Sequence, residues 1–235
     1  AFNELPVDFN ALPGANAAAI EFAGYCDALI DERRDSPGDD LVSALITAED
    51  DGHTLDHCEV VSMLILLLMA GHDTTKSLIS SGMRELLRHP DQAARLRDDP
   101  DITAAGIEEL LRYESPLHVA SGGGRWADAP VTLRGVTLEA GVPVRLLLGS
   151  ANRDPEAFDD PDVLDVDRHA SPHLAFGKGI HFCLGAALGR LEGHVVIPTI
   201  LRRFPDLALA RDDLEWRASF VTRQLAALPV RRTAR

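Results

Sequence analysis

The chain has little positive charge: 23 Lys and Arg stand against 37 Asp and Glu, which gives a formal net charge of −14 over 235 residues. Binding to nucleic acid or to an anionic membrane surface requires a basic patch, so this balance speaks against both partners. Cysteine is also scarce, with Cys26, Cys58 and Cys183 the three in the sequence. An odd, sparse set does not build a disulfide framework and indicates a reducing compartment, so we expect a cytoplasmic protein.

Long hydrophobic runs are missing as well. The longest apolar stretch covers residues 60–71, which include Ser62, and His72 and Asp73 follow at once. Twelve residues are too few to span a bilayer, which needs about 20. The N-terminal residues AFNELPVDFN lack the basic region of a signal peptide. We therefore expect neither a membrane span nor a secretion signal.

The apolar residues make up 46% of the chain, as in an ordinary globular protein, and their spacing predicts a mainly helical one. Helices are expected over residues 16–34, 41–48, 54–89, 90–97, 101–115 and 184–204. Thr54 is predicted to cap the longest of them, which contains no proline before Pro90. Because residues 63–70 are apolar on every side of this helix, we expect them to be buried in a large core.

Short strands are expected between and after the helices. Residues 131–133 and 136–138 read as a hairpin around Arg134 and Gly135, residues 143–148 as another strand, and the segment 207–230 as more of them. Helices and strands do not alternate as in βαβ units. The predicted fold class is mainly α with small β-sheets (α+β).

The segment that carries chemistry is residues 176–185, Phe-Gly-Lys-Gly-Ile-His-Phe-Cys-Leu-Gly. Its glycines permit unusual backbone conformations, and Cys183 lies where a helix is expected to begin, which makes a thiol thiolate-like. A flat iron cofactor needs such a soft anionic ligand with small residues around it. Two alternatives remain: a glycine-rich turn with a buried structural cysteine, or a zinc site of His181 and Cys183 with His169 or His173.

This segment resembles the haem-binding loop of the cytochromes P-450, whose pattern is F-G-x-G-x-[HR]-x-C-x-G. The matching positions are Phe176, Gly177, Gly179, His181, Cys183 and Gly185. The resemblance implies that these residues bind haem b (iron protoporphyrin IX), with Cys183 as the metal ligand and His181 on a haem propionate. Arg125, which follows three glycines, falls about where the family places a second propionate-binding residue.

A second motif, Ala70-Gly71-His72-Asp73-Thr74-Thr75, lies midway along the longest predicted helix. Glycine and threonine are poor helix residues and a carboxylate is costly to bury, so one interpretation is a kink in which the hydroxyls bond back to the helix. The motif also resembles the family's [AG]-G-x-[DE]-T-[ST] oxygen-activation motif. That resemblance implies that Asp73 and Thr74 are catalytic and relay protons through water to dioxygen, while Ala70 and Gly71 border the haem and leave room above it.

Glu109 and Arg112 make a third match. By themselves they read as a surface ion pair, one helical turn apart. They also resemble the family's E-x-x-R motif, whose members pair with a later arginine in a buried triad. Arg168 matches that third member, and the implied role is structural.

The resemblance implies a cytochrome P-450-like fold whose N-terminal part is absent, so that residues 1–235 form the C-terminal portion of one domain and residues 63–70 are partly exposed. The implied activity is that of a haem-thiolate monooxygenase. It would hydroxylate or epoxidise an apolar small molecule with electrons from NAD(P)H, delivered by ferredoxin reductase and ferredoxin. Segments 64–70, 116–120 and 219–221 would choose the substrate. A non-catalytic haem-binding fragment and a peroxide-using haem-thiolate enzyme are the alternatives.

Overall fold

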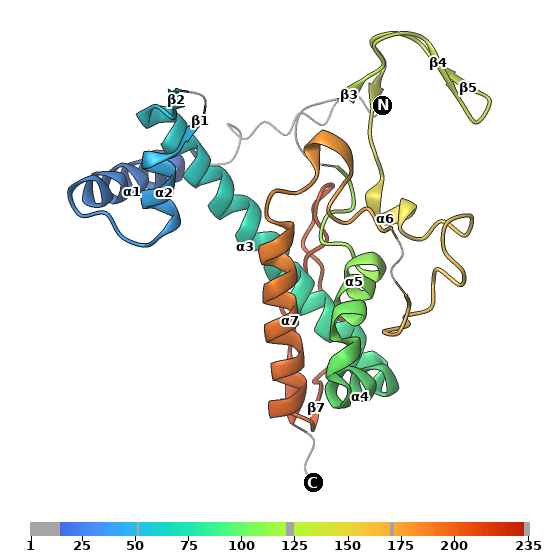
Figure 1. Ribbon diagram of the computed structural model, residues 1–235. Helices are drawn as coiled ribbons and strands as arrows, with labels where there is room; N and C mark the ends of the chain where they lie inside the picture. The colour runs from blue at the N-terminus through green and yellow to red at the C-terminus, as the bar shows by residue number, and fades with distance from the viewer. Residues whose placement is uncertain (1–14, 51, 121–124, 170–171, 233–235) are drawn as a thin grey trace. The chain divides into compact units, whose positions relative to one another are not determined.

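The computed structural model describes residues 15–50, 52–120, 125–169 and 172–232 (Figure 1). The chain divides into two compact units, residues 1–71 and 72–235. Helix α3 (His57–Arg88) begins in the first unit and ends in the second. Each unit has its own hydrophobic core and is described separately.

The first unit consists of α1 (Ala15–Asp35), α2 (Leu41–Thr47), a hairpin of β1 (Glu49–Asp50) and β2 (His53–Thr54), and the first half of α3. The hairpin lies between the helices expected over residues 41–48 and 54–89, where the sequence predicts no strand. The buried side chains of this unit share one small cluster, made of Cys26, Ile30, Val60 and Leu64. Burial raises the pKa of the Cys26 thiol, as expected for a cysteine that only packs.

The start of α3 differs from the prediction. Thr54 lies in β2, where it pairs with Glu49 of β1. Asp56 caps the helix instead. The Glu59 amide donates to Asp56 Oδ1 at 2.8 Å, and the Asp56 amide donates to Glu59 Oε2 at 2.9 Å. This reciprocal capping box satisfies two amides at once, which a cap at Thr54 does not. The prediction of Thr54 as the cap is therefore wrong.

The apolar stretch of α3 is only partly buried. Leu64 is 5% exposed, whereas Leu66 and Met69 are 58% and 64% exposed. The prediction that residues 63–70 are buried on all sides is therefore wrong for this chain. Among the described helices, α3 is also long and apolar enough to cross a membrane, a test that the core helix of a soluble protein passes as well.

The second unit is built on the rest of α3 together with α4 (Pro90–Asp98), α5 (Thr103–Tyr113) and α7 (Ala186–Arg203). A 3-10 turn, η2 (Pro100–Ile102), leads into α5. Figure 1 shows α7 beside α5 with α4 next to both, and these helices enclose the larger core. Its central members are Leu78, Met83, Leu86, Leu96, Ile107, Leu110, Leu111, Val166, Ile197 and Leu201.

A glycine permits the close approach of α5 and α7. A Cβ atom on Gly193 would lie 3.0 Å from Ile107 Cγ2 and 3.3 Å from a methyl carbon of Leu78. These contacts are tighter than side chains normally make, so a larger residue there would push the helices apart.

The strands of the second unit form small antiparallel pairs. β3 (Arg125–Trp126) pairs with β6 (Pro143–Val144), β4 (Val131–Leu133) with β5 (Val136–Leu138), and β7 (Leu207–Leu209) with β8 (Val230–Arg232). Arg134 and Gly135 have φ values of 47° and 81°, which gives the two-residue turn that the sequence predicts. The strand expected over residues 143–148 is shorter: β6 ends at Val144, residues 145–147 are irregular, and α6 (Leu148–Ala151) follows. The fold is mainly helical with small sheets, as predicted.

Candidate functional site

The cysteine loop, residues 172–185, is closed by its own backbone. The Cys183 amide donates to the Phe176 carbonyl at 2.9 Å, and the Phe182 amide donates to the Gly179 carbonyl at 3.0 Å. Gly177 and Gly179 have φ values of +72° and +81°, in the left-handed region that favours glycine. Two of the three glycines of the motif, Gly177 and Gly179, are therefore required by the conformation of the loop.

Cys183 is a free and exposed thiol. The helix expected over residues 184–204 begins at Ala186, with Gly185 as its cap, so the thiol lies just before the first turn of α7. A Cβ atom on Gly185 would be 3.9 Å from the sulfur, so the position beside the thiol is kept small. The exposure of Cys183 contradicts the alternative of a buried structural cysteine.

Large apolar side chains are exposed on the same loop. Ile180, Phe182 and Leu184 are 97%, 50% and 80% exposed. Leu188 and Leu191 in the first turns of α7 are exposed too, and their spacing of three residues places them on one face of that helix. Exposed apolar side chains beside a free thiol suit a flat apolar cofactor with a thiolate-ligated metal. The residues present therefore fit haem.

Phe176 fastens the loop to the helices. Its ring contacts the large core, and the guanidinium of Arg190 lies 4.5 Å from the ring centre. Glu108 holds that guanidinium with two hydrogen bonds of 2.7 and 2.9 Å and also contacts His173 at 3.0 Å. Burial alone would raise the pKa of Glu108, but the bonds with His173 and Arg190 outweigh it and lower the pKa to about 2. The carboxylate of Glu108 thus ties the loop to α7.

Asn152 makes a second attachment. Its side chain is fully buried, accepts from the Leu174 amide at 2.6 Å and donates to Ser115 Oγ at 2.7 Å. Ser115 in turn donates to the Leu111 carbonyl. Three segments far apart in the sequence are joined in this way, and nothing in the local sequence around Asn152 assigns it this role.

Glu109, Arg112 and Arg168 form the triad that the resemblance implies. Arg112 Nε and Nη2 donate to the two oxygens of Glu109 at 2.7 and 2.8 Å, and both side chains are 1% exposed. Arg168 Nε donates to Glu109 at 3.2 Å. The interpretation of Glu109 and Arg112 as a surface ion pair is therefore wrong.

Asp73 and Thr74 lie on α3 at the start of the second unit. Asp73 is 52% exposed rather than buried, and it forms an ion pair with Lys76 one turn later. The hydrogen bond from Lys76 lowers the pKa of Asp73. The adjacent Thr75 donates to Glu192 on α7 at 2.8 Å, which attaches this turn of α3 to the helix that follows the cysteine loop.

Ala70 and Gly71 are the last residues of the first unit and are exposed. Their place beside the haem therefore stays a prediction. Helix α3 is continuous from His57 to Arg88 and includes every residue of the motif at positions 70–75.

His181 and Arg125 reach no common partner in the described chain. His181 is exposed at the end of the 3-10 turn η3 (Gly179–His181), and Arg125 is half-buried in β3. Residues 121–124, the glycine stretch before Arg125, lie outside the described residues. Within the described ranges, no group of three or more His, Cys, Asp or Glu gathers as a metal site requires, so the zinc alternative finds no ligand set.

Two of the three segments expected to choose the substrate lie together. The His118 and Val119 amides donate to the Val221 carbonyl at 2.9 and 3.4 Å, and Leu117 bridges to Thr222. These bonds fix segment 116–120 against segment 219–221. The third segment, 64–70, belongs to the first unit.

Known proteins resemble the chain over almost its whole length. The family model of cytochrome P-450 matches residues 10–215. The polyketide biosynthesis cytochrome P-450 PksS of Bacillus subtilis is 45% identical over 92% of this chain and 53% of its own. The vitamin D(3) 25-hydroxylase of Pseudonocardia autotrophica is 43% identical over 98% of this chain and 57% of its own.

Solved structures agree with the sequence comparison. The structure of PksS from Bacillus subtilis 168 superposes with a TM-score of 0.90 and 41% identity, covering 98% of this chain and 59% of that one. The chain thus spans little more than half the length of the relatives that it matches.

Proposed function

The chain belongs to the cytochrome P-450 family, and on that premise we propose that it is a haem-thiolate monooxygenase or the C-terminal portion of one. The observation that carries this proposal is the free, exposed thiol of Cys183 before the first turn of α7, in a loop closed by the bond from its amide to the Phe176 carbonyl. In this proposal residues 1–235 are the C-terminal part of a single P-450 domain.

The haem-binding role of the cysteine loop follows from its chemistry. Cys183 would hold the haem iron through its thiolate, with Gly185 leaving space beside the sulfur. Phe176, Gly177 and Gly179 would give the loop its shape, while His181 and Arg125 would bind the propionates and Ala70 and Gly71 would border the other face. When bound, a thiolate-ligated haem b supplies the activation of dioxygen and the cleavage of its O–O bond.

Asp73 and Thr74 would relay protons through water. The pKa of Asp73 is held low by the hydrogen bond from Lys76, so its carboxylate is ionised at neutral pH and would accept hydrogen bonds from the water molecules through which protons pass. The hydroxyl of the next residue, Thr74, would orient that water. The bond from Thr75 to Glu192 attaches this turn of α3 to α7, which supports a fixed position for the proposed relay.

The electrons would come from NAD(P)H through ferredoxin reductase and ferredoxin, in the cytoplasm and without a membrane or nucleic-acid partner. The substrate would be an apolar small molecule, which the protein hydroxylates or epoxidises. The names of the relatives support this class, since one is a vitamin D(3) 25-hydroxylase and another belongs to polyketide biosynthesis. The joined segments 116–120 and 219–221 would form part of the surface that selects it.

A turnover assay tests the proton role of Asp73. The haem-loaded chain is supplied with NADPH, a ferredoxin and its reductase, with vitamin D3 as an apolar probe, and both dioxygen consumption and oxygenated product are measured. Asp73→Asn should lower product formation about a hundredfold, since a positioned acid–base group contributes at least that much.

Asp213→Asn serves as the matched control, because it removes an exposed carboxylate of the same unit outside α3 and the cysteine loop and leaves Asp73 in place. Hydrogen peroxide provides a second control, because it supplies protons and electrons together and should restore product in Asp73→Asn. Unchanged dioxygen-driven turnover in Asp73→Asn would contradict the relay.

A further inference from the structure

The second unit contains a cleft far from the cysteine in the sequence. It has a volume of about 390 Å³ and is lined by Arg84, Glu85, Arg88, His89, Tyr113, Glu114, Arg153 and Arg223. We call it the arginine cleft. Its walls come from the end of α3, the end of α5, the turn after α6 and the C-terminal segment, so it is built by tertiary folding rather than by one element.

The charges of the arginine cleft do not balance. Four guanidinium groups face two carboxylates, Glu85 and Glu114. Arg84 pairs with Glu85, and Arg223 Nε donates to Glu114 at 2.9 Å. Arg153 uses its donors on the Tyr113 carbonyl and on Asp162 outside the cleft. Two arginines per carboxylate therefore line a cleft in a chain that is strongly acidic overall.

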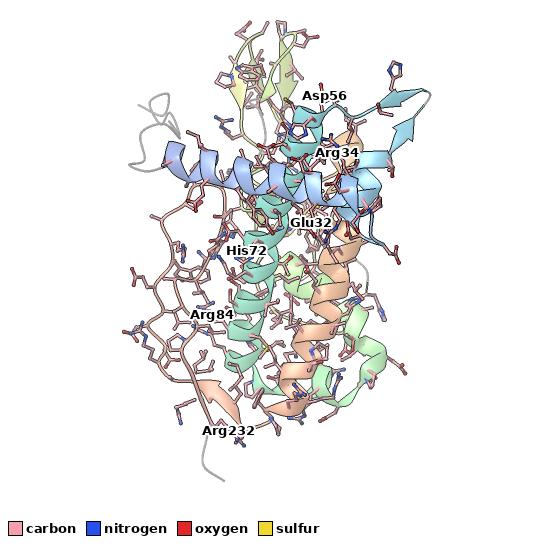
Figure 2. The ribbon with its side chains drawn as sticks, turned by 90° about the vertical axis from the view of Figure 1, so that its left-hand side faces the viewer. Glu32, Arg34, Asp56, His72, Arg84 and Arg232 are labelled. Carbon is pink, nitrogen blue, oxygen red and sulfur yellow. The ribbon has the colours of Figure 1, made fainter. Side chains whose placement is uncertain are left out.

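Arg84 shows that this cationic surface is prearranged. Its side chain is 15% exposed, and its Nε atom is buried without a hydrogen-bond partner among the described residues. The guanidinium lies 5.3 Å from the ring centre of Trp216, and that of Arg223 lies 3.8 Å from the same ring. Figure 2 shows Arg84 on the side of α3 where the C-terminal segment runs.

The electrostatics of Arg84 agree with this geometry. Burial lowers its pKa, and the neighbouring charges of Arg88 and Arg223 lower it further, while Glu114 opposes them. A buried donor without a partner costs free energy, and so do like charges at close range. An anion in the cleft would relieve both costs.

We propose that the arginine cleft is a binding site for a small multivalent oxyanion of the phosphate or diphosphate class, separate from the oxygenase chemistry. Guanidinium groups match tetrahedral and planar oxyanions with paired hydrogen bonds. Arg88 supplies an exposed donor group at the rim, and Arg84 and Arg223 supply an inner pair held by Trp216. A single monovalent ion would leave most of these donors unused.

Calorimetric titration with inorganic pyrophosphate tests the proposal, with chloride added to keep the ionic strength constant. The purified chain should bind one pyrophosphate with a Kd of about 1 mM or tighter, as a few charge-assisted bonds provide. Arg88→Gln should weaken the affinity about tenfold, because it removes one charged donor group. Arg84→Gln should weaken it at least as much.

Arg202→Gln is the matched control, since Arg202 is an exposed arginine on α7 outside the cleft. It should leave the Kd unchanged. Because Arg84 is largely buried and its variant can fail to fold, Arg88→Gln carries the decision, with thermal unfolding as a check that each variant is folded. The absence of saturable binding, or equal weakening by Arg88→Gln and Arg202→Gln, would overturn the proposal.

Discussion

Glu109 and Arg112 face each other in a two-pronged ion pair on α5, and each side chain is 1% exposed. Arg112 also donates to the carbonyls of Asn152 and Pro161 at 2.9 and 2.8 Å. One buried guanidinium therefore connects α5 to the irregular segment that leads to the cysteine loop. The loop depends on this connection because segment 152–168 has no strand or long helix of its own to hold it.

Glu109→Gln should destabilise the chain severely. The substitution leaves the guanidinium of Arg112 buried without its counter-charge, and breaking a buried pair in this way costs about 3–5 kcal/mol. Urea unfolding measures the effect. Glu156→Gln is the matched control, because the ion pair of Glu156 with Arg134 lies on the surface. Equal urea midpoints for Glu109→Gln and Glu156→Gln would contradict the structural role of the triad.

Asn152→Ala should loosen the cysteine loop. The Leu174 amide and Ser115 Oγ both lose a buried partner, which costs about 1–3 kcal/mol for each group left unsatisfied. Hydrogen exchange at the Leu174 amide should become faster than in the unchanged chain. The Phe204 amide, which bonds to the Ile200 carbonyl at the end of α7 and lies outside the loop, serves as the internal reference. Unaltered protection at Leu174 would show that Asn152 does not hold the loop.

Acid should release the attachment made by Glu108. Its pKa is about 2 in the folded chain against an ordinary 4.5, so its carboxylate favours folding above pH 4.5. That contribution is lost as the pH falls from about 4.5 to about 2, and it amounts to about 3 kcal/mol at most. In unfolding experiments across this range, Glu108→Gln should lose less stability than the unchanged chain. An equal loss of unfolding free energy in the two proteins across this pH range would refute the stabilising role of the Glu108 carboxylate.

Local chemistry made the helices and the hairpin predictable. Arg134-Gly135 fits a two-residue turn by itself, and proline and glycine mark most helix ends. The N-terminal cap of α3 was harder to predict, because Thr54 and Asp56 are both residue types that cap helices well. The two hydrogen bonds between Asp56 and Glu59 make Asp56 the cap. Pattern alone favoured the wrong residue.

The site was predictable where a motif lies in one segment. The cysteine loop and the Glu109–Arg112 pair were predicted from their resemblance to family motifs, each of which lies within one short segment. Asn152 is different, because its partners Ser115 and Leu174 lie 37 and 22 residues away and only tertiary folding brings them together. The exposure of Asp73 could not be foreseen either, since the apolar run before it suggests burial.

Thiolate ligation by Cys183 distinguishes the proposed function most directly. A carbon-monoxide difference spectrum of the haem-loaded chain, reduced with dithionite, measures it. Cys183 and Cys58 are both free and exposed, so Cys58→Ser is a matched control. The unchanged chain and Cys58→Ser should show a Soret band shifted far to the red, and Cys183→Ser should lack it. A band typical of histidine-ligated haem in the unchanged chain, or a red-shifted band that survives in Cys183→Ser, would contradict the haem-thiolate assignment.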